Sequence, residues 1–516
     1  MSQLYGSLAQ ASGRGRLRRE MREGYRRSLR LTALGTLVPG AGLTRTRHRT
    51  YGWVLVAAVV CVTLLIGLSV LTQGAMETVL SFVSSPTALE VAAVGALLLG
   101  VIWAGSIILT AISSRPSLLD RTRTRALAIF TAFMVAVVAT STYKAAEYAL
   151  ITKDTIVDVF GKSSGNIHAA KVVAGEDPWA VTPRVNILII GSDAGSDRTG
   201  TRTDSMIVAS IDTKTGRTVL VQLPRSLERA PLAPDSPLRR RYPSGFFGVP
   251  DSSCDQGPHG CLLTNLWMEA QSFKQANPTA YPGNDAPGRT EIRATIQEIT
   301  GLTIDHTVIV DLKGFERLID AMGGIDINVK GGGYDGRQPL PIGGHRDQYG
   351  VVSGVKSYFK LGPQHLNGYY ALWYARTRAA DDDTHRQTRQ RCVIRAIVNQ
   401  VNPAAMITKY AELAQILKDN LYTDIPADHL PAFVELIERV KKSKIVSLPL
   451  TPDHKIYAGN PDYALIRVLV KKAISPPPPA PKPHPTATPT TRTGSGTTRT
   501  TQPTPTGIPS AAADNC

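Results

Sequence analysis

The stretch VNILIIGSDAGSDRTGTRTDSMIVASIDTKTGRTVLVQLPRS, residues 185–226, decides how this chain folds. It contains three runs of β-branched and aliphatic residues, at 185–190, 204–213 and 217–224, and a short turn at 214–216 joins the last two. Runs of this length and composition, separated by glycine and polar residues, are typical of strands. The stretch therefore predicts neighbouring strands with charged loops at their ends.

Strands and helices alternate further along the chain. TVIVDL (307–312) is typical of a strand, and KGFERLIDAMGG (313–324) predicts a helix with one apolar stripe that its two glycines end. IDINV (325–329) predicts another strand. This alternation predicts an α/β fold, a layered sheet with helices on both faces. The chain has no GxGxxG or Walker loop, so we assign no nucleotide site.

Three uncharged apolar runs precede this region, at 50–76, 91–114 and 126–143. A helix needs about 20 apolar residues to cross the hydrocarbon core of a bilayer. Buried helices of a soluble core are the alternative, but three such runs so close together argue against it. We expect three transmembrane helices, and their ranges are 53–72, 91–112 and 126–146.

The net charge of +17 is concentrated beside the apolar runs. Residues 1–51 carry 11 Arg and 2 Glu, and residues 113–125 carry four Arg and one Asp. Positive loops stay in the cytoplasm, so these segments predict that the chain from about 147 onward lies outside. These segments are typical of sequences that set membrane topology and bind anionic lipids. We therefore expect no nucleic-acid partner.

The predicted organisation has five parts. They are a cytoplasmic basic arm (1–51), three transmembrane helices (52–146), an extracellular linker (147–180), an extracellular folded domain (181–473) and a disordered tail (474–516). The tail is rich in Pro and Thr and has almost nothing to bury, which favours an extended, unfolded state.

Two cysteines, Cys254 and Cys261, bracket a short turn-rich loop in the external part. An oxidising compartment favours a disulfide between them. A zinc site with His259 is the alternative, but it leaves the ligand set incomplete. Cys392 has an apolar helical context and is expected to be a buried thiol.

Charged residues gather in two places. The first set follows the opening strands and comprises Asp193, Arg202, Asp204 and Arg225. The second lies in ALWYARTRAADDDTHRQTRQRCVIRAIV (371–398) and comprises Arg376, Arg378, Asp383, Arg386, Arg389 and Gln390. Arg376 and Arg378 share a face if the chain is extended there, whereas Asp383, Arg386 and Gln390 share one face of a helix.

These residue types suit a metal and a phosphate group. Asp193 and Asp204 offer oxygen ligands for a hard cation such as Mg²⁺. Arginine binds phosphate through paired, charge-assisted bonds, and several arginines at one site indicate more than one phosphate, hence a pyrophosphate. Surface ion pairs with the Asp381–Asp383 run are the alternative.

The chain resembles the LytR-CpsA-Psr family, membrane-anchored phosphotransferases of Gram-positive cell walls. The resemblance covers about residues 185–450 and depends on the order and spacing of several motifs. They are NILIIGSD, RTDSM, LPRS, FERLIDAMGGIDINV, HLNGYYALWYARTR and the Asp383, Arg386, Arg389-Gln390 pattern. The basic arm and the Pro/Thr tail resemble an actinobacterial version.

The resemblance implies a function and roles for these residues. It implies Mg²⁺-dependent transfer of a glycopolymer from a polyprenyl pyrophosphate carrier to a peptidoglycan sugar hydroxyl, which leaves a phosphodiester. It makes Asp193 and Asp204 metal ligands that also take part in catalysis. It makes the polar residues of both sets catalytic or substrate-binding, namely Arg202, Arg225, Arg376, Arg378, Asp383, Arg386, Arg389 and Gln390.

Two features depart from the family pattern. Ser226 stands where the family usually has Asp, and residues 227–264 look like an insert near the site. Two alternatives stay open at this point. The domain could bind polyprenyl phosphates without turning them over, or it could hydrolyse the pyrophosphate, since transfer and hydrolysis differ only in the acceptor.

Overall fold

The computed structural model describes residues 2–73, 75–116, 119–160, 172, 177–193, 202–246, 261–332, 337–346, 351–401, 416, 418 and 420–475. It divides into two units, Met1–Gly161 with Pro426–Pro431, and Lys162–Ile425 with Ala432–Cys516. The predicted disordered tail beyond residue 475 lies outside the described residues, as do residues 161–171 and 173–176 of the predicted linker. The predicted part boundaries remain predictions.

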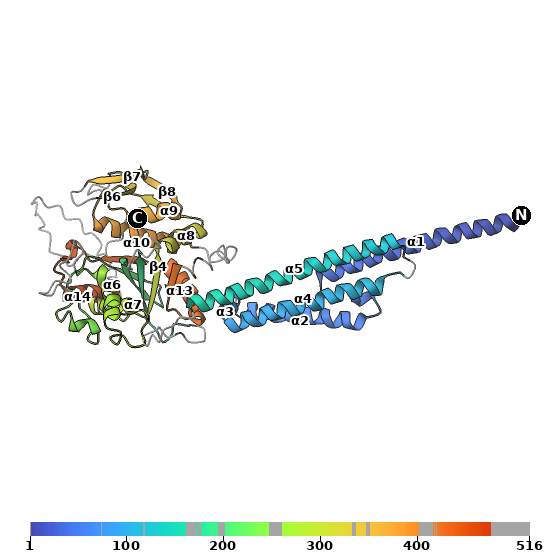
Figure 1. The fold of residues 1–516 in the computed structure, drawn as a ribbon, viewed down its shortest axis with the longest axis horizontal. Helices are drawn as coiled ribbons and strands as arrows, with labels where there is room; N and C mark the ends of the chain where they lie inside the picture. The colour runs from blue at the N-terminus through green and yellow to red at the C-terminus, as the bar shows by residue number, and fades with distance from the viewer. Residues whose placement is uncertain are drawn as a thin grey trace, which may run out of the picture. The chain divides into compact units, whose positions relative to one another are not determined.

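The first unit is an elongated helical bundle (Figure 1). Its elements are α1 Ser2–Leu37, η1 Leu43–Arg45, α2 Arg49–Gln73, α3 Ala75–Val83, α4 Pro86–Ser114 and α5 Arg121–Phe160. Three of them, α2, α4 and α5, are long and apolar enough to cross a membrane, so the three predicted apolar runs do form helices of spanning length. The basic arm is largely helical, and α5 runs on well past the predicted end of its span.

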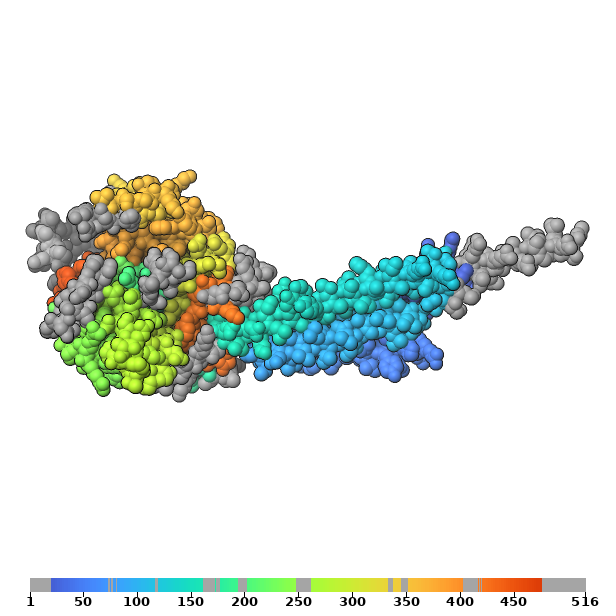
Figure 2. All heavy atoms as spheres, viewed as in Figure 1, coloured from blue at the N-terminus to red at the C-terminus, as the bar shows by residue number. Residues whose placement is uncertain are grey.

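Small residues let the helices of this unit approach closely. Helices α4 and α5 lie side by side (Figure 2). Gly100 of α4 lies directly against the Thr142 side chain of α5, so an added Cβ there would overlap it. Close approach of this kind is how helices pack in lipid, where burial against neighbouring helices gives no hydrophobic gain. A hydrogen bond from Trp103 Nε1 to Gly35 O (2.8 Å) joins α4 to α1.

The second unit is built on a six-stranded mixed sheet. Its strands are β1 Arg184–Ser192, β2 Thr203–Asp212, β3 Thr218–Leu223, β4 His306–Asp311, β9 Leu421–Thr423 and β10 Ile445–Pro449. Their order is β10-β3-β2-β1-β4-β9. The chain-neighbouring pairs β1–β2 and β2–β3 are antiparallel, whereas β1–β4 and β3–β10 are parallel. The strands predicted from the opening stretch are therefore confirmed.

Helices cover both faces of this sheet. Alternate residues of a strand point to opposite faces, and Met206 and Val208 of β2 join a large core with α6 Leu266–Ala276, α7 Pro287–Thr300 and α14 Tyr463–Ile474. Ile207 and Ala209 point the other way, toward α10 Asp383–Gln400. Helix α13 Leu430–Lys441 packs on that face through Phe433 and Leu436, against Val185. The predicted layered α/β sheet is confirmed.

A smaller cluster stands apart from the main sheet. Two two-stranded sheets pack with α8 Leu312–Met322 and α9 Gly368–Arg376. One pairs β5 Ile325–Val329 with β8 Gly362–Leu366, and the other pairs β6 Pro341–Arg346 with β7 Val352–Tyr358. Gly323 (φ 92°) ends α8 in a left-handed conformation, as its glycine pair predicted. Helix α10 belongs to both cores, because Val393 packs in this cluster and Ile394 on the main sheet. Short 3-10 turns complete the fold, at Pro237–Arg240, Leu263–Asn265, Ala427–His429 and Pro452–His454.

The cysteines differ from expectation in one respect. Cys261 and Cys392 are both disulfide-bonded, and Cys61 is free. The predicted Cys254–Cys261 bond remains a prediction, because Cys254 lies outside the described residues. The prediction that Cys392 is a thiol is wrong, although the residue is buried (7% exposed). An apolar helical context predicts burial but does not distinguish a thiol from half of a disulfide.

Candidate functional site

Two carboxylates mark one edge of the main sheet. Ser192, the last residue of β1, pairs with Thr203 of β2, so Asp193 and Asp204 lie near the same strand ends. The amide of Asp193 donates to Arg202 O (3.1 Å), and the amide of Arg202 donates to Asp193 Oδ1 (2.8 Å). These reciprocal bonds fix both residues. The loop between them, 194–201, lies outside the described residues.

Arg225 enters this edge from the segment that follows β3. Its Nη1 donates to Asp204 Oδ1 at 2.5 Å. The backbone of Arg225 is held too, because the amide of Thr264 donates to its carbonyl (3.0 Å) while Thr264 Oγ1 donates to Thr203 O (3.0 Å). The segment around Thr264 therefore ties Arg225 to the start of β2.

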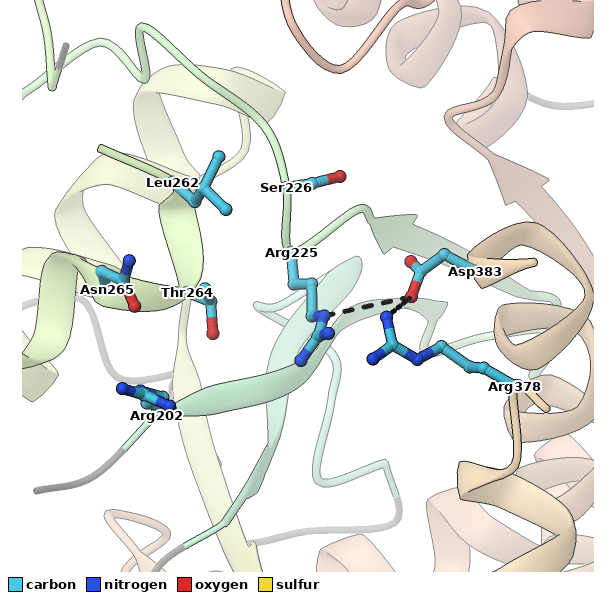
Figure 3. A pocket seen from close by; sticks show the side chains of 8 residues that line it. All are labelled: Arg202, Arg225, Ser226, Leu262, Thr264, Asn265, Arg378 and Asp383. Carbon is cyan, nitrogen blue, oxygen red and sulfur yellow. Dashed lines mark ion pairs between the residues drawn. The ribbon is translucent and has the colours of Figure 1, made fainter. Parts of the chain in front are cut away.

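Asp383 brings three arginines together at the start of α10. Its Oδ1 lies 2.8 Å from Arg386 Nη2, 3.8 Å from Arg378 Nη1 and 3.9 Å from Arg225 Nε. Figure 3 shows Arg225 and Arg378, which belong to different segments, both reaching the carboxylate of Asp383. Helical spacing predicted the Asp383–Arg386 contact, whereas the fold alone brings in the other two.

A cavity of about 250 Å³ lies at this cluster (Figure 3). Its lining residues are Arg202, Arg225, Ser226, Leu262, Thr264, Asn265, Arg378 and Asp383. Four of these residues are charged and four are neutral. The neutral residues other than Ser226 were missed from the sequence, because they carry no charge and lie within or directly after the segment taken for an insert.

The electrostatics favour an anion at this place. Arg386 is buried, and burial lowers its pKa to about 10, which still leaves it protonated at neutral pH. Burial also lowers the pKa of Arg378, and the nearby charge of Arg225 acts in the same direction. Such like charges repel one another, and a negative group that enters between them relieves this repulsion.

The other predicted site residues lie beside this cavity without lining it. Arg376 is half-buried and is the last residue of α9. Arg389 points into the protein, where its Nε donates to Tyr374 O (3.0 Å). Gln390 Oε1 accepts from Ser205 Oγ (3.1 Å) and from Gln222 Nε2 (2.8 Å), which anchors α10 on the sheet. Their roles in substrate binding remain predictions.

The described residues are suited to Mg²⁺, which needs few protein ligands, and not to a metal whose ligands all come from the protein. They contain no group of three His, Cys, Asp or Glu side chains arranged for a metal ion. Mg²⁺ commonly takes only one or two carboxylates and fills its other positions with water and phosphate oxygens. Asp193 and Asp204 at one sheet edge, beside an anion-attracting cluster, meet that requirement.

A sequence model of the LytR_cpsA_psr family matches residues 134–228 and 268–472, with the unmatched gap falling where the sequence indicated an insert. The chain belongs to the LytR_cpsA_psr family. The match takes in both charged sets and most of α5.

Curated relatives carry cell-wall names. The chain is 30% identical over 178 residues to a polyisoprenyl-teichoic acid–peptidoglycan teichoic acid transferase, TagV, of Bacillus subtilis, covering 34% of this chain and 42% of that protein. It is 27% identical over 251 residues to a TagU of Oceanobacillus iheyensis with the same activity in its name, covering 48% and 60%. It is also 25% identical to the cell wall biosynthesis protein LcpA of Corynebacterium glutamicum, covering 50% and 48%. The chain thus spans about half the length of these relatives.

Solved structures are similar at a lower level. The crystal structure of B. subtilis TagV is 24% identical with a TM-score of 0.35, covering 56% of this chain and 95% of that one. TagT bound to LI-WTA is 18% identical with a TM-score of 0.36, covering 61% and 96%. Likenesses of this size carry no conclusion about a ligand.

Proposed function

We propose that this protein transfers a glycopolymer from a polyprenyl pyrophosphate carrier to a sugar hydroxyl of peptidoglycan. The convergence of Arg225, Arg378 and Arg386 on the single carboxylate of Asp383, beside Asp204, carries the proposal. Three guanidiniums there face two carboxylates, which leaves positive charge for a diphosphate. Family membership and the names of the relatives support the choice of donor and acceptor.

The reaction exchanges one phosphorus–oxygen bond for another. The acceptor hydroxyl oxygen forms a bond to the phosphorus that bears the glycan, and the bridging bond of the pyrophosphate breaks. The electron pair of that bond leaves on polyprenyl phosphate, and the hydroxyl proton passes to solvent. The product is a phosphodiester between glycopolymer and peptidoglycan. Little covalent chemistry falls to the protein, which has to position the groups and neutralise charge.

The arginines serve both requirements. The buried Arg386 and the half-buried Arg225 hold fixed positions, because Asp383 and Asp204 bind them. Arg378 is the more exposed member, with 48% of its side chain accessible, and it contacts incoming phosphate oxygens. Donors that are already oriented stabilise charge in the transition state without reorganising. Mg²⁺ on Asp193 and Asp204 would add neutralising charge at the phosphate oxygens.

The three candidate membrane helices support a domain anchored to the bilayer that holds the donor. The charge distribution of residues 1–51 and 113–125 supports a domain on the outer side of the cell membrane. A membrane-anchored domain meets a lipid-linked donor in the same bilayer, and peptidoglycan is on that side too.

The test is a transfer assay with the full-length chain in detergent or nanodiscs. The chain is incubated with a lipid-pyrophosphate-linked glycan, peptidoglycan oligomers and Mg²⁺, and the products are identified by mass spectrometry. Glycan joined to peptidoglycan through one phosphate, with release of polyprenyl phosphate, supports the proposal. Free glycan phosphate as the only product indicates a hydrolase, and bound but unchanged donor indicates a carrier.

A matched pair of variants controls the assay. Asp204→Asn removes a carboxylate at the site end of β2, whereas Asp212→Asn removes one at the other end of the same strand, where it pairs with Arg184. Asp204→Asn should abolish transfer while Asp212→Asn leaves it, and equal loss in both would contradict the assignment.

A further inference from the structure

Arg389 lies behind the segment that carries Arg376 and Arg378. Its side chain is 7% exposed, and it does not line the cavity. Its donors are nevertheless nearly all used. Nε donates to Tyr374 O (3.0 Å), Nη2 donates to Thr377 O, and both terminal nitrogens bind the carboxylate of Asp381.

The partner of Arg389 is buried as deeply. The Asp381 side chain is 1% exposed, and its two oxygens lie 2.5 Å and 3.0 Å from Nη1 and Nη2 of Arg389. A paired geometry of this kind fixes orientation as well as distance. One guanidinium therefore holds the segment 374–381 at its beginning, its middle and its end.

That segment needs such support. Helix α9 ends at Arg376, and Thr377 turns into an extended conformation (φ −58°, ψ 136°). The segment that follows belongs to no strand or helix until α10 begins at Asp383. Arg378 sits in it, and its side chain is 48% exposed. Only a fixed backbone can keep so exposed a side chain within 4 Å of Asp383.

We propose that Arg389 and Asp381 are a positioning pair that holds the 374–381 segment, and with it Arg376 and Arg378, in the orientation that the donor requires. The inference rests on the proposed function only in naming that donor. In the family pattern Arg389 stands next to residues that bind the pyrophosphate. Here its side chain bonds to protein groups of the segment 374–381 and does not line the cavity. Its effect on turnover is exerted through Arg376 and Arg378.

The first test is hydrogen–deuterium exchange of the full-length protein, read by mass spectrometry over 374–381. Arg389→Lys keeps the charge opposite Asp381 but cannot bond three residues at once. The matched control is Arg395→Lys on the same helix, whose Nη2 donates to Ile445 O (3.1 Å), away from this segment. We expect at least tenfold faster exchange of 374–381 in Arg389→Lys and no change there in Arg395→Lys. Unchanged exchange in both variants would overturn the proposal.

The second test asks whether Arg389 acts through Arg378. In the wild-type background Arg378→Ala should lower kcat/KM for the lipid-linked donor at least tenfold. In the Arg389→Lys background, where Arg378 is already misplaced, the same change should cost less than threefold, because residues that act as a unit are not additive. If Arg389 were purely structural, Arg389→Lys would lower the melting temperature and the active fraction and leave the donor KM unchanged. The losses of kcat/KM caused by Arg389→Lys and Arg378→Ala would then multiply. Multiplying effects would refute the positioning role.

The outcomes separate this proposal from the proposed function. If the wild type gives no transfer product, the proposed function fails, and the exchange measurement still decides whether Arg389 holds the segment. If Arg389→Lys does not fold, Asp381→Asn replaces it, since it retains hydrogen-bonding oxygen and nitrogen atoms while removing the charge. Normal exchange of 374–381 in folded Asp381→Asn would equally overturn the pair.

Discussion

Replacing Arg378 by alanine should separate activity from stability. The side chain is 48% exposed, and its ion pair with Asp383 Oδ1 is long, at 3.8 Å. Exposed pairs contribute about 0–1 kcal/mol, and removing Arg378 also relieves its repulsion with Arg225. The free energy of unfolding should therefore fall by less than about 1 kcal/mol.

The expected loss of activity is much larger. A hydrogen bond between charged groups contributes about 1.5–3 kcal/mol. If that bond forms to a phosphate oxygen in the transition state, its loss lowers the rate by roughly one to two powers of ten, at 1.36 kcal/mol per factor of ten. Arg378→Lys keeps the charge but loses the planar pair of donors, so it should recover only part of the rate.

The assay compares transfer rate and melting temperature for Arg378→Ala, Arg378→Lys and a control. Arg467→Ala is the control, because Arg467 is an exposed arginine on α14 that donates to Glu298 O (2.8 Å), away from this cavity. It should shift the melting temperature by a similar small amount and keep full activity. Wild-type transfer in Arg378→Ala, or a loss that merely follows its melting temperature, would refute the role of Arg378 at the phosphate.

Three further predictions follow from other parts of the structure. Asp383→Asn should lower the free energy of unfolding by about 3 kcal/mol in denaturant titrations, because it leaves the buried Arg386 (5% exposed) without this carboxylate. The value is the lower end for a broken buried pair, since Asp383 itself is 28% exposed. Glu291 is buried, with Ser236 and Tyr281 as its donors, and burial raises its pKa above the ordinary value of 4.5. The stability that this gives is fully present below pH 4.5 and should be lost as pH rises through the folded pKa. Glu291→Gln should flatten that part of the stability–pH curve, and an unchanged curve would contradict the assignment. Peptide mapping without reduction should recover Cys261 linked to Cys254, and finding it linked elsewhere would correct the prediction from the sequence.

Local pattern was enough to predict four of the six strands of the main sheet, and α8, whereas β9 and β10 were not predicted. The runs around 185–224 form paired strands in the sheet as their composition indicated, and the glycine pair ends α8. What the pattern could not supply was the partner of each strand. The predicted strand at Ile325–Val329 does form, but it pairs with β8 outside the main sheet. A burial alternation specifies which face of a strand is inside and leaves the choice of neighbour to long-range packing.

The same limit applies to α10. Asp383, Arg386 and Gln390 share one helix face, as their spacing predicted, and the first two are in contact at 2.8 Å. Seven residues also advance about 10 Å along a helix. Gln390 therefore bonds to Ser205 and Gln222 on the sheet and does not line the cavity. Angular position on a helix could be predicted from the sequence, whereas depth relative to the cavity depended on where α10 crosses the sheet.

Three arginines of α10 are buried, and their partners explain where the site lies. Buried charge is costly unless it is paired and hydrogen-bonded. Arg389 has the carboxylate of Asp381 at both terminal nitrogens, and Arg391 donates from Nη1 to Gln222 Oε1 (2.6 Å). Arg386 shares the one carboxylate of Asp383 with Arg225 and Arg378, and its Nε has no hydrogen-bond partner among the described residues. Arg389 thus has a carboxylate of its own, whereas beside the cavity three arginines share that of Asp383, which is where a phosphate group would complete the charge.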